Sequence, residues 1–364
     1  MKDDLVQAFL DPPKQFRPSP FWSWNDALRE EELRWQVREM KDKGFGGYFM
    51  HSRVGLVTEY LSEEWMKMIG ACLDEGKKVG MESWLYDEDK WPSGFAGGLV
   101  PEKSRSFRAR SIELRKIAGS ELATLKQNPD LLAVFSVRTT PDGKIADLSK
   151  VFPWGEPAGE GGLVAFLSVE DKESPWYNGE TYVDLLNPEV TEAFLKVTHE
   201  AYAKKFRKDF GEFMPGIFTD EPNYSSSGRP PWTTGFGGYF KEKNGYDILE
   251  KLPYLFYQGN ETVEVRHDFW KTVTRRFIEA WTIPLASGCE KVGLQLTGHY
   301  LSEDTLPNQV RVIGAAMPHY EYMHVPGIDH LCRNIANPLT LKQLSSAGRQ
   351  FGRKRLMCEI FGCS

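Results

Sequence analysis

Strand-like and helix-like stretches alternate through the first part of the chain, and this rhythm restricts the fold more than any other sequence feature. The predicted helices carry apolar residues at helical spacing, such as Leu33, Val37 and Met40. Strands are predicted at 19–25, 46–50 and 81–86, and helices at 29–43 and 62–78. Short joins between such elements favour parallel strands connected by right-handed crossovers. The sequence therefore predicts an α/β fold around a parallel sheet.

The alternation stops after the third strand. Residues 100–186 are strand-like with turn-rich joins, which indicates a β-rich insertion of the kind that barrel loops accept. Its strands are predicted at 106–117, 131–137, 163–169 and 181–185. Later barrel strands are predicted at 214–222, 294–300, 317–325 and 355–360, with helices at 188–210, 240–252, 263–291 and 339–351. The chain thus divides into a first part of the barrel (1–99), the insertion (100–186) and a second part of the barrel (187–364).

Seven predicted barrel strands indicate a (β/α)8 TIM-type barrel that is truncated after strand seven. Such a barrel would still need its last helix, an eighth strand and an eighth helix, so we expect a C-terminal remainder to be missing. A doubly wound open sheet is the alternative fold. Against it, no Gly-x-Gly-x-x-Gly follows the first strand, and no Gly-Lys-Ser/Thr phosphate loop occurs in the sequence.

Composition argues against several classes of function. The chain has 45 Lys and Arg against 51 Asp and Glu, a net charge of −6 without a long basic run, so nucleic acid is not an expected partner. No apolar run has the length that spans a membrane, and the first ten residues lack the apolar core of a signal peptide. The five cysteines are odd in number and form no Cys-x-x-Cys pair, which favours a cytoplasmic protein with reduced thiols. The sequence does not determine an oligomeric state.

The strongest candidate for chemistry lies in residues 214–222. Ile217 and Phe218 fit a short buried strand, which places Asp220 and Glu221 at its C-terminal end. Active sites of parallel α/β folds lie at that end of the sheet. The alternative is that the acidic pair and the following proline only begin a helix, because both are favoured in a first turn.

Polar and aromatic residues also end the other predicted strands. In a barrel they converge on one face, because the C-terminal ends of all strands meet there. The candidates for substrate binding are Trp24, Asn25, His51, Asp87, Asp220, His299, Tyr300 and His324, and Glu359 ends the seventh strand. Any single histidine also has a structural explanation, and an outward-pointing Trp24 would belong to the core. Trp91 and Trp232, in loops rich in Gly and Pro, are better candidates for stacking on a sugar ring.

Two carboxylates framed by aromatic and imidazole groups are what glycoside hydrolysis requires. One carboxyl group protonates the leaving oxygen, while the other attacks the anomeric carbon or activates a water. The acid needs a raised pKa, which an apolar or like-charged neighbour supplies. The separation of the two groups decides between retention and inversion, and the sequence does not give it. The core chemistry requires no cofactor.

Three segments of the chain carry a resemblance to a known family. They are the run from Pro12 to the Phe-Trp-Ser-Trp-Asn that ends at Asn25, the Glu-rich helix leading to Gly44-Phe45-Gly46-Gly47, and Thr219-Asp220-Glu221-Pro222. Together they resemble the catalytic barrel of glycoside hydrolase family 106, the α-L-rhamnosidases, and its uncharacterised relatives. Asp-Glu-Pro is also similar to the Asn-Glu-Pro that ends strand four in the broad clan of barrel glycosidases. The resemblance implies that Glu221 is the proton donor, that Glu359 is the nucleophile or base, and that the substrate ends in a sugar such as α-L-rhamnose.

The same resemblance implies a possible calcium ion near the sugar hydroxyls, and a small-molecule or oligosaccharide substrate as the partner. Two other functions stay open on the sequence alone. One is a non-hydrolytic carbohydrate-binding barrel that keeps the pocket without the chemistry. The other is a metal-dependent hydrolase or isomerase that uses His51, Asp87, His299 and Glu221, although the His-x-His spacing of many barrel metal sites does not occur.

Overall fold

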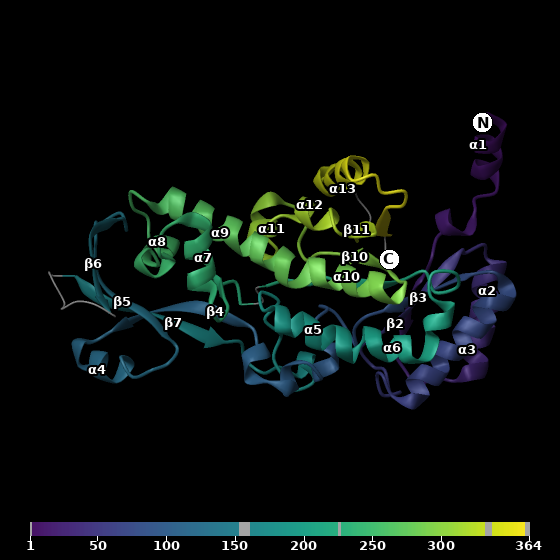
Figure 1. Ribbon diagram of the computed structural model, residues 1–364, viewed down its shortest axis with the longest axis horizontal. Helices are drawn as coiled ribbons and strands as arrows, with labels where there is room; N and C mark the ends of the chain where they lie inside the picture. Colours follow the sequence, from purple (N-terminus) through teal and green to yellow (C-terminus); the bar gives the residue numbers. More distant parts are fainter. Residues whose placement is uncertain (1, 153–160, 225–226, 332–336, 361–364) are drawn as a thin grey trace.

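A computed structural model describes residues 2–152, 161–224, 227–331 and 337–360, and its centre is a curled parallel sheet (Figure 1). The sheet has seven strands in the order β1-β2-β3-β8-β10-β11-β12, and every neighbouring pair is parallel. The strands are β1 (Phe21–Trp24), β2 (Gly47–Ser52), β3 (Glu82–Tyr86), β8 (Gly216–Asp220), β10 (Gln295–His299), β11 (Val325–His330) and β12 (Met357–Ile360). This order follows the chain without a switch point, so the sheet is an incomplete barrel and the predicted fold class is confirmed.

Helices pack on the outer face of this sheet. They are α2 (Glu30–Asp42), α3 (Glu63–Val79), α5 (Pro188–Val197), α6 (His199–Phe206), α10 (Ile283–Val292) and α13 (Leu339–Gln350). A π-helical segment (Ile278–Thr282) joins α10 to α9 (Thr262–Phe277), which extends away from the parallel sheet along the long axis (Figure 1). The start and end of α3 follow from its sequence: Ser62 Oγ accepts a hydrogen bond from Trp65 N, and Gly80 ends the helix at φ 73°. The short helix α1 (Lys2–Leu10) projects from the body (Figure 1). No helix among the described residues is long and apolar enough to cross a bilayer.

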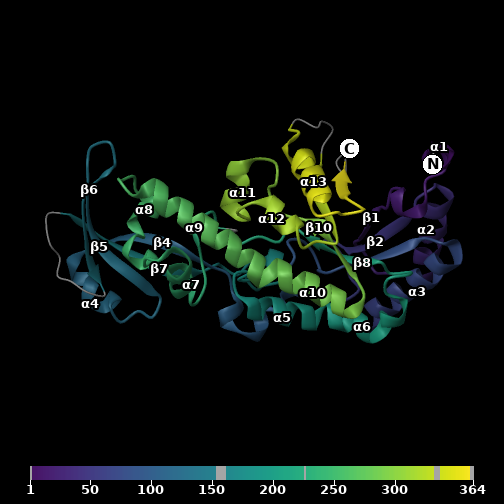
Figure 2. The same ribbon diagram turned by 45° about the horizontal axis from the view of Figure 1, so that its top comes forward.

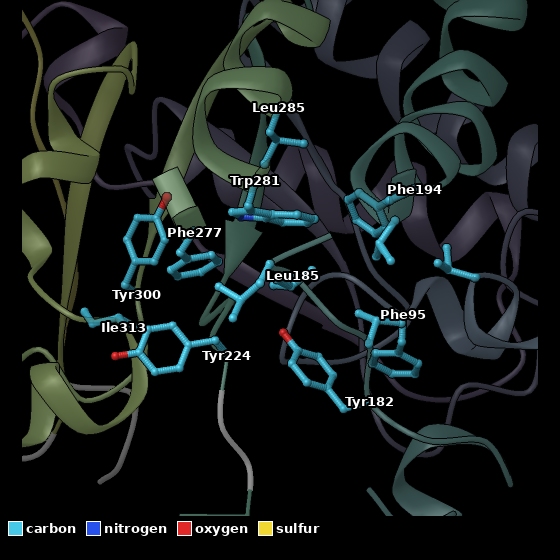
Figure 3. Close-up of a cluster of buried hydrophobic side chains, with 14 of the residues drawn as sticks. Phe95, Tyr182, Leu185, Phe194, Tyr224, Phe277, Trp281, Leu285, Tyr300 and Ile313 are labelled. Carbon is cyan, nitrogen blue, oxygen red and sulfur yellow. The ribbon is translucent and has the colours of Figure 1, made fainter. Parts of the chain in front are cut away.

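The outer core lies between the sheet and these helices. Figure 3 shows aromatic side chains from distant segments packed together, including Phe277 and Trp281 on the α9–α10 helical rod and Tyr182 from the region before α5. Outward-facing strand residues such as Ile217 and Leu296 belong to the same cluster. Burial of this apolar surface holds the helices against the sheet.

Apolar side chains cover part of the inner face of the sheet. We call this set the apolar layer; its members are Phe21, Phe49, Trp84, Phe218, Val325 and Met357. Its rings contact one another, with 5.4 Å between the centroids of Phe49 and Phe218. A cavity of about 550 Å³ lies against this layer on the side of β1 and β12. Among the described residues no pairing joins β1 to β12, so the sheet is open there.

The residues between β3 and β8 form four strands of a second, antiparallel sheet, which confirms the predicted β-rich insertion, and the loop after β8 adds a short fifth strand. The order of this sheet is β6-β5-β7-β4-β9, and it lies at the far end of the long axis from α2 and α3 (Figures 1 and 2). The strands are β4 (Arg110–Ile117), β5 (Leu131–Thr139), β6 (Ile145–Phe152), β7 (Gly162–Glu170) and β9 (Pro231–Trp232), and the short helices around them are α4 (Leu122–Leu125), α7 (Phe236–Asn244) and α8 (Pro253–Phe256). The sequence did not predict β6, and the predicted strand at 181–185 forms only an isolated bridge at Val183.

The sixth barrel strand lies further along the chain than predicted. Residues 316–320 form the helix α12 (Ala316–Tyr320), which follows α11 (Leu306–Val312), and the strand β11 begins only at Val325. Pro318 explains part of the difference, because it lacks the N–H that a sheet ladder needs but fits the first turn of a helix. His319 and Tyr320 are buried by helix packing rather than by strand alternation.

Candidate active site

A layer of polar side chains lies on the inner face of the sheet at the C-terminal ends of the strands. It consists of His51, Tyr86, Asp220, His299, Asp329 and Glu359, which we call the polar layer. Alternate residues of a strand point to the same face, so His51 follows Phe49 inward and Asp220 follows Phe218. The same strands therefore supply both layers.

Asp220 is at the centre of the polar layer. The Tyr86 hydroxyl donates to Asp220 Oδ2 at 2.7 Å. His299 Nε2 lies 3.3 Å from Asp220 Oδ1 and 2.9 Å from Glu359 Oε2. His51 Nε2 is 3.9 Å from Asp220 Oδ2, too far for a hydrogen bond but close enough for electrostatic attraction. The His299 ring thus bridges two carboxylates.

These contacts set the charge states of the layer. Burial by itself lowers the pKa of His299, but the hydrogen bond to Glu359 and the nearby charges of Asp220 and Glu359 raise this pKa well above its ordinary value. Burial opposes ionisation of Asp220, yet the interactions with His51 and His299 outweigh it and lower the pKa of Asp220. Burial also lowers the pKa of His51. At neutral pH the layer therefore holds an imidazolium at His299 and a neutral ring at His51.

Glu221 follows β8 directly and has an unusual backbone conformation. Its φ of 49° lies in the left-handed region, which residues other than glycine rarely adopt. This turn ends the strand alternation, and a Glu221 carboxylate oxygen comes within 4.8 Å of ligand atoms of both His299 and Asp329. Burial is the main cause that raises the pKa of Glu221 to about 7. The two adjacent carboxyl groups therefore differ in protonation: Asp220 is ionised near neutral pH, whereas Glu221 holds its proton more strongly.

Gly298 permits this arrangement. Its φ is 128°, and a Cβ atom at this position would lie 1.8 Å from the carbonyl oxygen of Thr219. The glycine therefore lets β10 run close to β8, which sets His299 beside Asp220 in register. The backbone N–H of Glu221 then donates to the carbonyl oxygen of His299 at 3.2 Å.

Glu303 supports the far side of the pocket. Its Oε1 accepts hydrogen bonds from Tyr300 N at 3.1 Å and from the Tyr320 hydroxyl at 2.8 Å, and its Oε2 accepts from Asp329 N at 3.2 Å. Burial raises the pKa of Glu303 to about 7 and that of Asp329 to about 6. A cavity of about 370 Å³ lies between these groups and Glu221. The cavity is thus lined by several carboxyl groups that hold protons unusually well.

The loop at 88–98 is tied to Asp220. Glu88 is buried and accepts hydrogen bonds from four backbone N–H groups of this loop, which fixes its course. Ser93 N donates to the Asp220 carbonyl, and Asp220 N donates to Ser93 Oγ, both at 2.7 Å. Ser93 Oγ in turn donates to Asp87 Oδ1 at 2.6 Å. Asp87 is therefore placed where it supports the backbone of Asp220.

The structure brings together only some of the residues predicted from the sequence. His51, Asp220, His299 and Glu359 meet in the polar layer, and Glu221 lies beside it. Asp87 supports the backbone of Asp220 through Ser93. The remaining four candidates lie elsewhere: Trp24 packs against Trp65 in the outer core, Asn25 is exposed, Tyr300 points into the core beside Phe277 (Figure 3), and His324 precedes β11.

His324 lies at the opposite end of the sheet. Its Nδ1 accepts a hydrogen bond from Leu296 N near the start of β10, and its Nε2 lies 3.1 Å from Glu290 Oε1. The prediction that His324 binds substrate followed from the misplaced sixth strand, because His324 lies next to the last residue of the predicted strand 317–325. The structure gives it a structural role instead.

The two predicted stacking platforms are also occupied. Trp91 lies between the guanidinium of Arg53, 4.4 Å from its ring centroid, and Trp176, whose ring centroid is 4.7 Å away. Trp232 is buried against Phe236. Neither ring is free to receive a sugar.

Three residues of the site were not predicted: Tyr86, Glu303 and Asp329. The signal for Asp329 was present, because Val325-Pro-Gly-Ile-Asp329 repeats the apolar run and terminal acid of 216–220. Tyr86 was recognisable as an inward position two residues after Trp84, once β3 was assigned. Glu303 follows its strand within a loop, and no local pattern distinguishes it.

Two groups of side chains in the described part of the chain have ligand atoms close enough for a metal ion. They are Asp220, His299 and Glu359, and Glu221, His299 and Asp329, with the atoms of each group within 4.8 Å of one another. His299 belongs to both groups and would have to release its proton to ligate a metal, so binding there would be coupled to proton release. Neither group contains His51 or Asp87, so the metal set predicted for a metal-dependent hydrolase is not assembled among the described residues.

Comparisons with known proteins identify a similar fold. No family model matches this sequence, and no curated protein matches it. Among solved structures, the rhamnosidase from Novosphingobium sp. PP1Y is similar, with a TM-score of 0.66 and 11% sequence identity over 98% of this chain and 53% of that chain. The chain therefore spans about half the length of that protein. At this identity the likeness shows the fold alone.

A second solved structure also matches. The catalytic domain of beta-amylase from Paenibacillus polymyxa shares 10% identity over 95% of this chain and 92% of that chain. Its TM-score is 0.29, so it adds nothing to the fold assignment.

Proposed function

We propose that this chain is a glycoside hydrolase that cleaves a terminal sugar such as α-L-rhamnose, with Glu221 as proton donor and Glu359 as nucleophile or base. The observation that carries the proposal is the position of Glu221 at the end of β8, where it borders a cavity and follows the buried Asp220; burial there raises the pKa of Glu221 to about 7. A carboxylic acid that keeps its proton near neutral pH, beside carboxylates that do not, is the arrangement that acid-catalysed glycoside cleavage needs. The solved rhamnosidase of similar fold guides the choice of sugar.

Glu221 would act on the oxygen of the glycosidic bond. Its carboxyl group borders the cavity of about 370 Å³, which provides space for a sugar ring beside Glu221 and Asp329. Proton transfer to the leaving oxygen converts Glu221 to a carboxylate, and the neighbouring imidazolium of His299 stabilises that charge. Asp220 would tune this step, because its own charge favours the protonated form of Glu221.

Glu359 would act on the anomeric carbon, either directly or through a water. Its hydrogen bond with His299 orients the carboxylate, and its side chain is 20% exposed and lines the cavity of about 550 Å³ at β1 and β12. Asp329 is a competitor for this role, because its carboxylate is within 4.8 Å of Glu221. Glu359 is preferred because it holds the position on β12 that the family resemblance assigns to the nucleophile or base, and variants of both residues decide between them.

The carboxylates of Glu221 and Asp329 also fit part of a calcium site. Calcium takes six to eight oxygen ligands, so substrate hydroxyls, backbone carbonyls or waters would have to complete the set. A calcium ion bound there would orient the sugar hydroxyls and offset the negative charge of the pocket. The protein residues would still supply the proton and the attack.

The proposal is tested with a panel of nitrophenyl glycosides and the corresponding methyl glycosides. We expect release of one sugar, and we expect Glu359→Gln to lower kcat by roughly 10²- to 10⁴-fold on both series. Glu221→Gln should lower kcat strongly on the methyl glycosides and much less on the nitrophenyl glycosides, because nitrophenolate leaves without much help from an acid. The anomer of the first product, followed by NMR, distinguishes retention from inversion.

Asp329→Asn is the matched control for Glu359→Gln. Full activity of Glu359→Gln together with an inactive Asp329→Asn would transfer the second role to Asp329. Full activity of Glu221→Gln on the methyl glycosides would disprove the assignment of the acid. Saturable sugar binding without any release, across the whole panel, would instead support a non-hydrolytic carbohydrate-binding protein.

A further inference from the structure

Arg53 is the starting point for a further inference. It lies two residues after His51, and its backbone N–H donates to the carbonyl oxygen of Trp24 at 3.0 Å. Its guanidinium stacks over Trp91 with 4.4 Å to the ring centroid. Of the arginines that the structure describes, Arg53 is the only partly buried one whose guanidinium makes neither a hydrogen bond nor an ion pair with the protein.

A second arginine–tryptophan stack shows what Arg53 lacks. Arg355 lies over Trp84 with 5.2 Å to the ring centroid, and both of its terminal nitrogens donate to Glu82 Oε2 at 3.0 Å. A guanidinium offers five donors in a planar fork that matches carboxylate and sulfate groups. At Arg53 this fork is held in position by an aromatic ring but has no anion. A partly buried guanidinium without an anionic partner is energetically unfavourable, and an anionic ligand would supply that partner.

The position of Arg53 links it to the candidate active site. Trp91 belongs to the loop that Ser93 joins to the backbone of Asp220 through two hydrogen bonds. Arg53 directly follows β2, two residues after His51 of the polar layer. We call this edge of the site, just past the end of β2, the rim; it is separate from the cavity of about 370 Å³ beside Glu221.

A small cavity of about 200 Å³ adjoins Arg53 on this rim. It is lined by Arg53, Tyr60, Asp89, Lys90 and Asn178 among others. Lys90 Nζ donates to Asn178 Oδ1 at 2.7 Å, and Asn178 Nδ2 donates to Asp89 Oδ2 at 3.0 Å. Lys90 also lies 3.9 Å from Asp89, so these three side chains satisfy one another. The exposed Glu59 also lines the cavity without an ion pair to Arg53. Arg53 supplies the positive charge that is left for a ligand.

We propose that Arg53 binds a negatively charged group on the substrate, a uronate carboxylate or a sulfate ester, so that the substrates are acidic glycosides. This inference rests on the proposed glycosidase function. The acidic group belongs to the sugar unit that lies over the rim, next to the one cleaved. A guanidinium fork accepts both kinds of anion by the same pair of charge-assisted hydrogen bonds.

Competition with the nitrophenyl glycoside that the enzyme cleaves tests the proposal. D-glucuronate, glucose 6-sulfate and neutral glucose are compared as inhibitors, using wild-type protein, Arg53→Gln and Arg115→Gln. Arg115 is exposed on β4 of the insertion, so this control removes the same charge far from the site. We expect one of the two acidic sugars to inhibit at least about tenfold better than glucose, as one charge-assisted hydrogen bond predicts.

The preference for the acidic sugar should disappear in Arg53→Gln, persist in Arg115→Gln and weaken at high salt. Which acidic sugar inhibits distinguishes a carboxylate site from a sulfate site. An unchanged preference in Arg53→Gln, or equal inhibition by all three sugars in the wild type, would overturn the proposal. If no glycoside is cleaved, calorimetric titration of D-glucuronate and glucose 6-sulfate into the same three proteins measures the binding of the acidic sugars directly. Binding by wild type and not by Arg53→Gln would then support the subsite while the glycosidase function fails.

Discussion

The apolar and polar layers of the inner face come from the same strands, yet they have opposite chemistry. In the apolar layer, Phe49 and Phe218 are packed ring against ring. Two residues further along the same strands, His51 and Asp220 face each other across 3.9 Å in a charged network. A folded sheet gains stability from the first layer, while the second collects buried ionisable groups that oppose folding unless they are paired. The polar layer therefore contributes less to stability than the apolar layer, and it contains the ionisable groups that the proposed function uses.

The largest effect we expect is on stability, from the replacement of an apolar-layer residue. Phe218→Ala should lower the free energy of unfolding by about 3–5 kcal/mol, because it leaves a cavity among buried rings. Urea denaturation measures this. The matched polar-layer change, Asp329→Asn, should leave stability unchanged or raise it, because it removes a charge that burial disfavours. Equal losses in both variants would show that the two layers do not differ in this way.

A smaller effect concerns the pH dependence of activity. The acid at Glu221 must carry its proton, and its pKa of about 7 is above the ordinary value for Glu. We expect kcat/KM to be maintained below about pH 7 and to fall roughly tenfold per pH unit above it. Glu221→Gln keeps no titrating acid at this position, so the fall above neutral pH should be absent from its residual activity. A profile of the same shape in Glu221→Gln would assign the proton to another group.

The smallest effect is expected at the other end of the strands. His324→Gln should leave kcat/KM within about twofold and lower the free energy of unfolding by about 0.5–1.5 kcal/mol, the contribution of one hydrogen bond. Steady-state kinetics and thermal unfolding measure the two quantities. A loss of activity without a loss of stability would return His324 to the list of site residues.

The sequence predicted the parallel sheet, the insertion and the central acid pair, because each has a local signal. Regular alternation marked β1 to β3, and the apolar run before Asp220 marked β8. The position of the sixth strand was predicted wrongly because Pro318 and its neighbours form the helix α12. The burial of that helix depends on packing against distant helices, which the local sequence does not show. That error concealed Asp329 and promoted His324, since a strand's end determines which residue faces the site.

The sequence also did not predict the direction in which the side chains at the strand ends point. Trp24 and Tyr300 lie at strand ends as predicted, but both point into the outer core. Successive residues of a strand point to opposite faces of the sheet, so the register of a strand determines whether its last residue faces the site or the outer core. That register is known only once the neighbouring strands are placed. The role of Glu303 depends on a contact between two loops, which no local pattern encodes.

The left-handed backbone of Glu221 has a consequence for how such a protein can change by selection. Glycine or asparagine adopts φ near 49° with less strain, so either residue at position 221 is expected to make the fold more robust. A library screened only for heat tolerance should therefore accumulate Gly or Asn at this position and lose its acid. If glutamate persists at position 221 in a diverging population, selection for catalytic activity explains its persistence.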